Sequence, residues 1–344
     1  MTGVDVTMSA GPLHSVVVPV FNEADGIAAF HERCAAALTA IGNRYEIIYV
    51  DDGSRDTSWA RLLAIRDGDT NVRLMRLSRN FGHQIAVSAG IEHAGGDTVT
   101  VLDADLQDPP EVIAQMVDAW REGADIVYGV RTARRGETWF KRGTAKLFYR
   151  TMRNLADVDM PVDVGDFRLL SRRATDSLVS MPEHHRYVRG MVAWLGYDST
   201  SVAYARDSRF AGESKYNLVK MVRFALDGIL SFSIRPLRIA TWVGLLASIA
   251  AFAIAIVLIV LRLFGDVPVQ GWTSLAVLVL LSSGVQLMTI GMLGEYIGRI
   301  WTEVRGRPLY LLRDLQGFSR DDAARRLHTR ARRLGPDEDI ERRG

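Results

Sequence analysis

The sequence predicts an α/β fold with a mostly parallel sheet, followed by two helices that cross a membrane. The sheet is predicted because short apolar segments alternate with segments of helical periodicity over residues 14–130. The membrane helices are predicted from two uncharged runs, Ile239–Leu261 and Val267–Gly294, since a span needs about 20 apolar residues. The length of 344 residues suits about two domains.

Composition excludes several classes of protein. The formal net charge is only +2, so bulk charge does not favour a nucleic-acid partner. The single cysteine, Cys34, excludes an internal disulfide framework and most thiolate metal sites. The chain does not open on a basic flank followed by an apolar core, so we expect no secretory signal and a cytoplasmic location for the first 236 residues.

The predicted strands and helices alternate in order along the first 130 residues. Each strand is a short apolar run, and each helix repeats apolar residues at helical spacing. The predicted strands are 15–20, 46–50, 72–77, 98–102 and 126–128, and the predicted helices are 24–41, 57–66, 84–93 and 110–121. Such alternation is typical of a parallel sheet with helices on both faces.

The second half of the chain is predicted in four parts. Residues 137–215 are less regular and rich in arginine, and they complete a soluble domain over 1–215. Residues 216–236 mix basic and apolar residues at helical spacing, which suits an interfacial helix or an amphipathic helix packed on that domain. The predicted spans are 237–263 and 270–298, followed by a cytoplasmic tail, 299–344. After Pro308 this tail is expected to form a surface helix and a disordered end.

Arginines on both sides of the predicted spans fix the expected topology. Arg235 and Arg238 precede the first span, and Arg299, Arg305 and Arg307 follow the second. By the positive-inside rule, both chain ends face the cytoplasm and the short connecting loop faces outward. The sequence therefore predicts an integral inner- or plasma-membrane protein.

Polar residues follow each of the first four predicted strands. They are Asn22 and Glu23, Asp51 and Asp52, the segment Asn80–Gln84, and Asp103 and Asp105. Ligands of open α/β sheets bind beyond the carboxyl ends of the strands, where these residues are expected to meet. Asn22 and Glu23 suit a helix start or a nucleobase contact equally. One of the two neighbouring aspartates is expected to cap a helix, and Asp52 to bind the base or ribose.

The segment Thr98–Pro110, TVTVLDADLQDPP, carries the candidate metal ligands. Its apolar strand ends in Asp103 and Asp105, followed by Gln107, and such oxygen ligands suit Mg²⁺ or Mn²⁺. A divalent ion of this kind holds a diphosphate and helps to expel it as a leaving group. The plainer alternative is a solvated turn. We therefore expect a metal-assisted transfer reaction, with Asp105 and Gln107 on the ion and Asp103 on the ion or a ribose.

Five motifs together resemble family 2 glycosyltransferases of the GT-A fold, in the polyprenyl-phosphate (dolichyl-phosphate) subgroup. They are PVFNE (19–23), VDDGSRD (50–56), SRNFGHQ (78–84), DADLQDPP (103–110) and GDFRL (165–169). RFAGESKY (209–216) and the paired C-terminal apolar runs extend the likeness over residues 14–312. The motifs are specific for the family and much less so for the sugar.

The resemblance implies a role for each matching residue. Positions that line the nucleoside pocket are Pro19, Phe21, Glu23, Val50 and Asp52, and positions around the metal and diphosphate are Asp103, Ala104, Asp105 and Gln107. Phe21 stands where many relatives carry tyrosine. Arg131 matches a phosphate-facing arginine, and Arg209 and Lys215 match a basic pair that closes over the donor phosphates. Asp166 matches an acid that serves as catalytic base or sugar anchor.

The acceptor implied by the resemblance is a lipid monophosphate. Its second pKa is about 6, so it is largely dianionic near neutral pH and needs little base catalysis. Arg131, Arg142 and Lys146 are candidates for binding it, with surface charges as the alternative. Asp166 then orients the sugar or the acceptor-binding arginines, or only pairs with Arg168. A single displacement inverts the anomeric configuration, so an α-linked donor would give a β-linked product.

The function predicted is transfer of one hexose from a nucleotide sugar to polyprenyl phosphate. UDP-glucose is the preferred donor, and GDP-mannose and UDP-N-acetylhexosamines are alternatives. No GxGxxG follows the first strand and no P-loop motif is present, which disfavours a dehydrogenase or NTPase. A processive synthase is disfavoured because HRYVRG (185–190) stands where a QxxRW-type motif is expected. A non-catalytic nucleotide-sugar sensor is a further alternative. Oligomeric relatives, including tetramers, imply a homo-oligomer.

Overall fold

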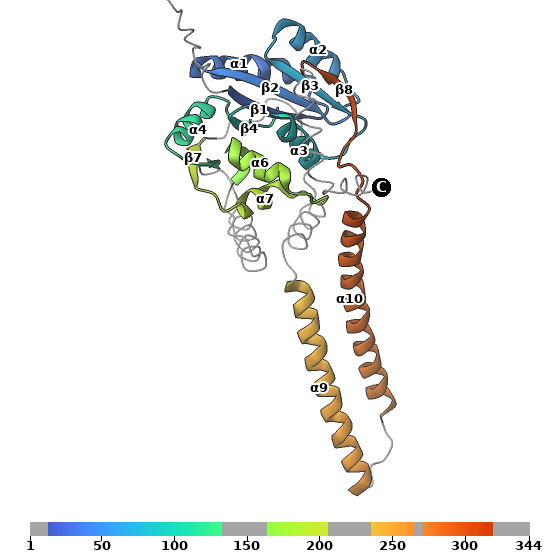
Figure 1. Cartoon of the computed structure of the whole chain (residues 1–344). Coiled ribbons are helices and arrows are strands. Elements are labelled where there is room, and N and C mark those ends of the chain that lie inside the picture. The colour runs from blue at the N-terminus through green and yellow to red at the C-terminus, as the bar shows by residue number, and fades with distance from the viewer. Residues whose placement is uncertain (1–12, 133–163, 206–234, 265–270, 319–344) are drawn as a thin grey trace, which may run out of the picture. The chain divides into compact units, whose positions relative to one another are not determined.

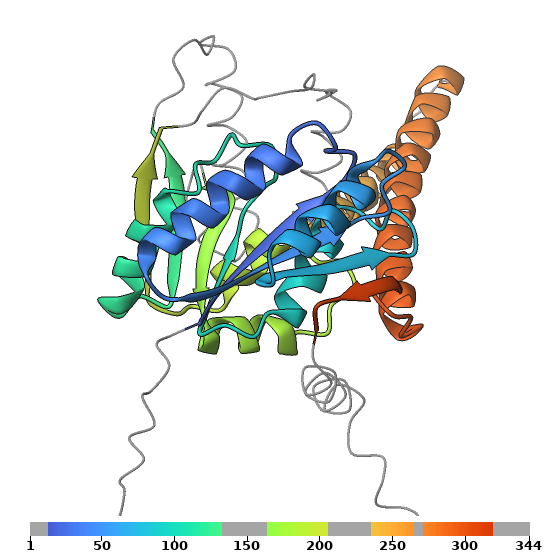
Figure 2. The same cartoon turned by 90° about the horizontal axis from the view of Figure 1, so that it is seen from above.

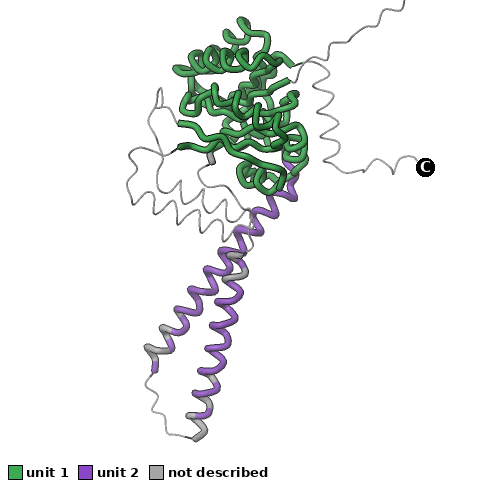
Figure 3. Tube along the Cα trace, turned by 90° about the vertical axis from the view of Figure 1, so that its left-hand side faces the viewer, with its two compact units in different colours: residues 1–146, 158–216, 308–344 green, residues 147–157, 217–307 purple. Residues whose placement is uncertain are grey.

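The computed structural model describes residues 13–132, 164–205, 235–264 and 271–318 (Figure 1). The chain divides into two compact units, coloured separately in Figure 3. The sheet unit comprises residues 1–146, 158–216 and 308–344, and the helical unit comprises 147–157 and 217–307. The predicted segment 216–236 lies outside the described residues except for its last two.

The sheet unit is built on eight strands. They are β1 (Leu13–Val20), β2 (Arg44–Asp51), β3 (Val72–Leu77), β4 (Thr98–Val101), β5 (Ile126–Arg131), β6 (Val164–Ser171), β7 (Ser199–Tyr204) and β8 (Leu312–Gln316), in the order β7-β5-β6-β4-β1-β2-β3-β8. The strands β3, β2, β1 and β4 are parallel, as are β5 and β7. In contrast, β6 runs antiparallel to both β4 and β5, and β8 antiparallel to β3.

Helices cover both faces of this sheet (Figures 1 and 2). They are α1 (Ile27–Ile41), α2 (Ser58–Gly68), α3 (His83–His93), α4 (Val112–Arg121), α6 (Arg172–Ser180) and α7 (Val188–Trp194). Because side chains alternate along a strand, Val16 and Val18 pack with Phe30 of α1 on one face, while Val17 meets α3 on the other. Gly90 permits that approach of α3, since a Cβ there would collide with Val17.

The sequence predicted this part of the fold well. All nine elements predicted between residues 15 and 128 are present, with ends that differ by three residues or fewer. The predicted α/β class with a mostly parallel sheet is confirmed. The segment called less regular contributes β6, α6, α7 and β7, which the sequence did not predict.

The tail departs from the prediction over its described part, while residues 319–344 lie outside the described residues. Residues 312–316 form β8 rather than part of a surface helix, because the outer edge of β3 offers unpaired backbone groups that a strand can satisfy. The approach to β8 is tied down as well. The Ser78 N–H donates to the Leu311 carbonyl (2.8 Å), and the Tyr310 hydroxyl donates to Glu92 Oε2 (2.9 Å).

The described part of the helical unit consists of α9 (Arg235–Phe264) and α10 (Trp272–Val304). The two predicted spans, 237–263 and 270–298, fall on these helices. Over the residues that the structure describes, however, no helix combines the length and apolarity required of a membrane span. Large apolar side chains are exposed on both helices, including Trp242 and Phe252 on α9 and Leu287 on α10.

Candidate active site

A pocket lies at the point of the sheet where the order of the strands reverses, between β1 and β4. The strand β1 lies between β2 and β4, so the connections that follow β1 and β4 diverge and leave a crevice beyond their carboxyl ends. A cavity of about 300 Å³ opens there. It is lined by Pro19, Val20, Phe21, Glu23, Asp52, Asn80, Gly82, His83, Ala86, Asp103, Ala104 and Asp105. The polar residues after all four predicted strands therefore contribute to one pocket.

The loop after β1 is locked to the loop after β2. Asn22 adopts a left-handed backbone (φ 55°), a conformation that asparagine tolerates better than most residues. Its side-chain oxygen accepts the Arg55 N–H (2.9 Å), and its own N–H donates to Ser54 Oγ (3.0 Å). Because α1 begins only at Ile27, Asn22 is a brace between loops rather than a helix cap. Glu23, next to it, lines the pocket.

The two aspartates after β2 have different surroundings. Asp51 is fully buried, accepts the Ser54 N–H (3.0 Å) and pairs with Arg76, so it braces its own turn rather than capping α2. Asp52 lines the pocket and accepts the N–H groups of Phe81 (2.7 Å) and Gly82 (2.9 Å). Burial raises the pKa of Asp52, and these two hydrogen bonds oppose that rise. Asp52 thereby holds the loop between β3 and α3 against the pocket.

The loop after β4 presents two carboxylates to the same pocket. Asp103 and Asp105 both line it, and the Gln107 N–H donates to Asp105 Oδ1 (3.1 Å). Withdrawal from water, together with the charges of Asp166, Asp105 and Asp108, raises the pKa of Asp103 to about 6 against the opposing effect of His83. Oxygen donors that repel one another in this way fit a hard divalent cation.

The described residues supply only part of a metal coordination shell. Among the described residues, no group of three or more His, Cys, Asp or Glu side chains is placed to hold an ion by itself. A cation at Asp103 and Asp105 would therefore need oxygen ligands beyond these two carboxylates. Gln107 is not among the residues that line the pocket, although its backbone N–H donates to Asp105 Oδ1.

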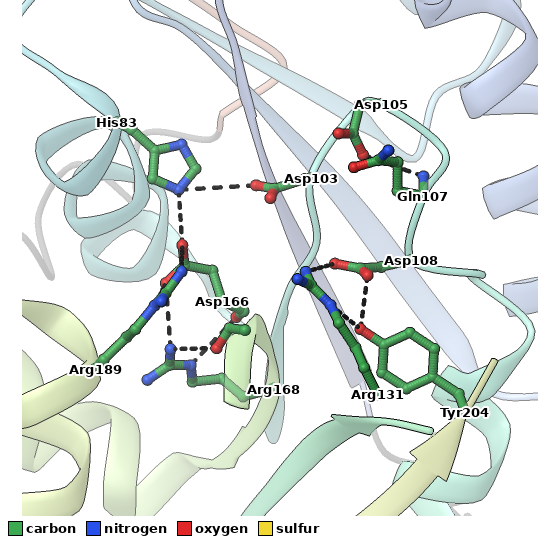
Figure 4. Close-up of polar contacts among 11 residues, drawn as sticks. His83, Asp103, Asp105, Gln107, Asp108, Arg131, Asp166, Arg168, Arg189 and Tyr204 are labelled. Atoms are coloured by element: carbon green, nitrogen blue, oxygen red, sulfur yellow. Dashed lines mark hydrogen bonds and ion pairs between the residues drawn. The ribbon is translucent and has the colours of Figure 1, made fainter. Parts of the chain in front are cut away.

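Behind the pocket, Asp166 on β6 is surrounded by cations (Figure 4). Arg189 of α7 donates Nε to Oδ1 and Nη2 to Oδ2, each at 2.9 Å. Arg168 donates Nη2 to Oδ1 (3.3 Å), and His83 Nε2 lies 3.3 Å from Oδ2. Although burial alone would raise the pKa of Asp166, His83, Arg189 and Arg168 hold it well below its usual value. We call these four residues the Asp166 cluster.

His83 connects that cluster to the pocket. Its Nε2 is also 3.7 Å from Asp103 Oδ1, so the imidazole lies between two carboxylates. Burial would lower the pKa of His83, but the hydrogen bond to Asp166 and the charge of Asp103 raise it overall. Because a carboxylate only accepts hydrogen bonds, His83 Nε2 is the donor to Asp166.

A second group lies on the other side of the loop after β4 (Figure 4). The Tyr204 hydroxyl donates to Asp108 Oδ1 (2.6 Å), and Arg131 donates Nη2 to Asp108 Oδ2 (3.2 Å) and Nε to the Tyr204 hydroxyl (3.3 Å). Burial would lower the pKa of Arg131, but Asp108 and Tyr204 raise it overall. We call these three residues the Arg131 cluster.

The predicted site residues are thus placed in several ways. Those that line the pocket are Pro19, Phe21, Glu23, Asp52, Asp103, Ala104 and Asp105. Val50 does not line it, because its side chain is fully buried in β2 on the face that meets Gly90 of α3. Arg131 and Asp166 lie in the two clusters. Arg142, Lys146, Arg209 and Lys215 lie outside the described residues.

Asp108, Arg189 and Tyr204 were not predicted as site residues from the sequence, and His83 was predicted only as part of the segment Asn80–Gln84. His83, Asp108 and Arg189 lie within motifs already noted, SRNFGHQ, DADLQDPP and HRYVRG, so their presence there was a usable signal. Tyr204 lies in STSVAY, a strand without any motif. Only its register with β5, which places it opposite Arg131, brings it to the site.

Comparisons with known proteins agree on one family. Residues 15–179 match the model described as glycosyl transferase family 2. The chain is 44% identical to the uncharacterized glycosyltransferase YkcC of Bacillus subtilis over 321 residues, which cover 93% of this chain and 99% of that one. It is 45% identical to the uncharacterized glycosyltransferase sll0501 of Synechocystis over 304 residues, covering 88% and 96%. It is 41% identical to the bactoprenol glucosyl transferase of Shigella phage SfII over 300 residues, covering 87% and 97%.

Proposed function

The chain belongs to glycosyl transferase family 2, and from this premise we propose that it transfers one hexose from a nucleotide sugar to a polyprenyl phosphate. The single observation that carries the proposal is the likeness to bactoprenol glucosyl transferases, which extends over nearly the whole of those relatives. The mostly parallel sheet is consistent with the GT-A fold of the family. We propose glucose as the hexose and UDP-glucose as the donor.

The pocket supports binding of the donor in a defined direction. All five of the residues Pro19, Phe21, Asp52, Asp103 and Asp105 line the pocket. We propose that the first three bind the nucleoside and that the two aspartates lie at the diphosphate. We propose that Asp105, assisted by Asp103, holds Mg²⁺ or Mn²⁺. When bound, the ion neutralises the diphosphate charge that develops as the glycosidic bond breaks.

The acceptor needs positioning more than activation. A lipid monophosphate is largely dianionic near neutral pH, so its oxygen attacks the anomeric carbon without loss of a proton. One displacement of this kind breaks the bond from sugar to diphosphate and inverts the anomeric configuration. We propose that Arg131 binds a phosphate oxygen and that Asp166 orients the groups around it. Arg142, Lys146, Arg209 and Lys215 remain predicted phosphate ligands.

A lipid acceptor requires access to a membrane. We propose that the helical unit brings the chain to the cytoplasmic face of the bilayer, and the exposed Trp242, Phe252 and Leu287 support that role. Extraction of cell membranes with alkaline carbonate tests it. Retention in the membrane pellet is expected, and release into the supernatant would contradict integral attachment. We also propose a homo-oligomer, which light scattering of the detergent-solubilised protein would check.

The transfer itself is tested by product mass. Purified full-length protein is incubated with Mn²⁺, a short polyprenyl phosphate, and UDP-glucose, GDP-mannose or UDP-N-acetylglucosamine in turn. We expect one hexose on the lipid from UDP-glucose, in β linkage by NMR, and nucleoside diphosphate release that needs metal, donor and acceptor together. Addition of several sugars would indicate a processive enzyme, and donor binding without release would indicate a sensor.

A further inference from the structure

Arg131 is held along one edge of its guanidinium group. It is the last residue of β5, and the parallel register of β5 and β7 places it opposite Tyr204. Asp108 reaches the same point from the loop after β4. The three side chains close a triangle in which the hydroxyl of Tyr204 both donates to Asp108 and accepts from Arg131 (Figure 4).

Burial shows that this triangle is part of the interior. Asp108 is 1% exposed and Tyr204 5%, whereas the Arg131 side chain is 18% exposed. The absence of a side chain at Gly165 makes room for the guanidinium, because a Cβ there would lie 2.9 Å from Arg131 Nη2. The acid and the phenol are therefore enclosed, and the arginine alone of the three keeps a substantial exposed surface.

The hydrogen bonds to Asp108 and Tyr204 do not use all the N–H groups of Arg131. A guanidinium carries five N–H groups, and Nε and Nη2 make the bonds to Tyr204 and Asp108. Within the described part of the chain, Nη1 makes no hydrogen bond. The planar fork of arginine matches phosphate oxygens, but only when its orientation is fixed.

We propose that Tyr204 is a positioning residue which, together with Asp108, fixes the Arg131 guanidinium so that its remaining N–H groups bind a substrate phosphate. The inference rests on the proposed function, because it assigns a phosphate to Arg131. It also connects the phosphate-binding arginine to the loop that carries Asp105, since Asp108 belongs to that loop. Movement of the loop would therefore move the guanidinium.

Tyr204→Phe tests this role because it removes only the hydroxyl. The matched control is Tyr197→Phe, which also loses one phenol hydrogen bond, that to Ser177 Oγ (2.8 Å), in the same unit but outside both clusters. We expect Tyr204→Phe to raise the KM of one substrate by about tenfold with little change in kcat. A rise confined to polyprenyl phosphate assigns Arg131 to the acceptor, and one confined to the nucleotide sugar assigns it to the donor. Tyr197→Phe should leave both KM values unchanged.

A double-mutant cycle separates positioning from a merely structural role. Arg131→Lys keeps the positive charge but loses the planar guanidinium. Adding Tyr204→Phe to Arg131→Lys should therefore raise KM no further. Asp108→Asn should raise the same KM as Tyr204→Phe, which gives a second variant if the first fails to fold. Unchanged KM values in folded Tyr204→Phe, or effects that multiply in the double variant, would overturn the inference. Failure of the wild-type protein to form any lipid-linked hexose would instead overturn the proposed function.

Discussion

The two polar clusters at the sheet edge use the same residue types in opposite ways. In the Asp166 cluster, one carboxylate receives donors from Arg189, Arg168 and His83. A carboxylate has about four lone-pair directions, so all of them are taken. In the Arg131 cluster, one cation is braced by an acid and a phenol but keeps N–H groups for a ligand. The first arrangement anchors an acid, and the second presents a cation.

This difference bears on which residue takes part in the reaction. A carboxylate with a depressed pKa and occupied oxygens is a poor proton acceptor. The proposed acceptor has no proton to lose, so the reaction does not require one. We therefore interpret Asp166 as the anchor that orients Arg189 and His83, and we assign contact with substrate phosphate to Arg131.

The largest expected effect tests the proposed cation at Asp105 and Asp103, in the pocket next to both clusters. Asp105→Ala should lower transfer by about a thousandfold, because it removes a ligand of the ion that neutralises the leaving diphosphate. Release of nucleoside diphosphate and Mn²⁺ affinity by calorimetry measure the effect. Asp118→Ala, at an exposed acid of α4 paired with Arg121, is the control and should behave as wild type. Wild-type turnover by the Asp105 variant would remove the metal assignment.

The next effect distinguishes an anchor from a base. Asp166→Asn and Arg189→Gln should each lower kcat by about a hundredfold, since each disorders the same group of side chains. The double variant should be no slower than either single one. Arg173→Gln, which breaks an ion pair with Asp125 away from the site, is the control.

The pH profile completes that test. If Asp166 is an anchor, the acidic limb of the kcat/KM profile keeps its position in Asp166→Asn. If Asp166→Asn instead loses the acidic limb, and Arg189→Gln lowers kcat much less than Asp166→Asn does, Asp166 would be the base. The contrast between an anchoring acid and a ligand-binding cation would then be wrong.

The contribution of Asp166 to the stability of the folded protein should depend on pH. Its folded-state pKa lies below the ordinary 3.8, so its contribution to stability is complete above that value and is lost as the pH falls through the lower folded value. The gap in melting temperature between wild type and Asp166→Asn should be constant near neutral pH and narrow in acid. Asp118→Asn serves as the exposed control. A gap that narrows instead as the pH rises toward neutral would mean that Asp166 is not stabilised as the anion.

Local patterning explains why the sequence predicted the pocket but not the clusters. The strands β1, β2 and β4 are buried along nearly their whole length, so they appear in the sequence as short apolar runs. The ends of these strands and the acids that follow them could therefore be placed in advance. The strand β7 gives no such signal, because its first three residues, Ser199–Ser201, are exposed. The insertion of β6 between β4 and β5, and the bond from Arg189 to Asp166, depend on register between distant segments. Spacing along the chain does not encode either.

The strand β8 shows the same limit at the far edge of the sheet. Its residues are mostly exposed and carry two charges, so neither apolar alternation nor composition predicts a strand. Pairing with β3 supplies the stabilisation that the local sequence lacks. For this reason residues 312–316 do not begin the helix that the sequence predicted after Pro308.

The smallest expected effect comes from a tyrosine that resembles Tyr204 in chemistry alone. The hydroxyl of Tyr310 donates to Glu92 Oε2 (2.9 Å) next to β8, outside both clusters. Tyr310→Phe should lower the free energy of unfolding by about 1 kcal/mol, the usual net value of one such bond, and leave both KM values unchanged. Thermal unfolding and steady-state kinetics on the same preparation measure the two effects. Because Tyr204 and Tyr310 each bond an acid, a rise of KM in Tyr310→Phe equal to that in Tyr204→Phe would mean that loss of any such bond loosens the site. In that case Tyr204 would have no specific effect on substrate binding, and the proposed role of the Arg131 cluster in binding phosphate would be wrong.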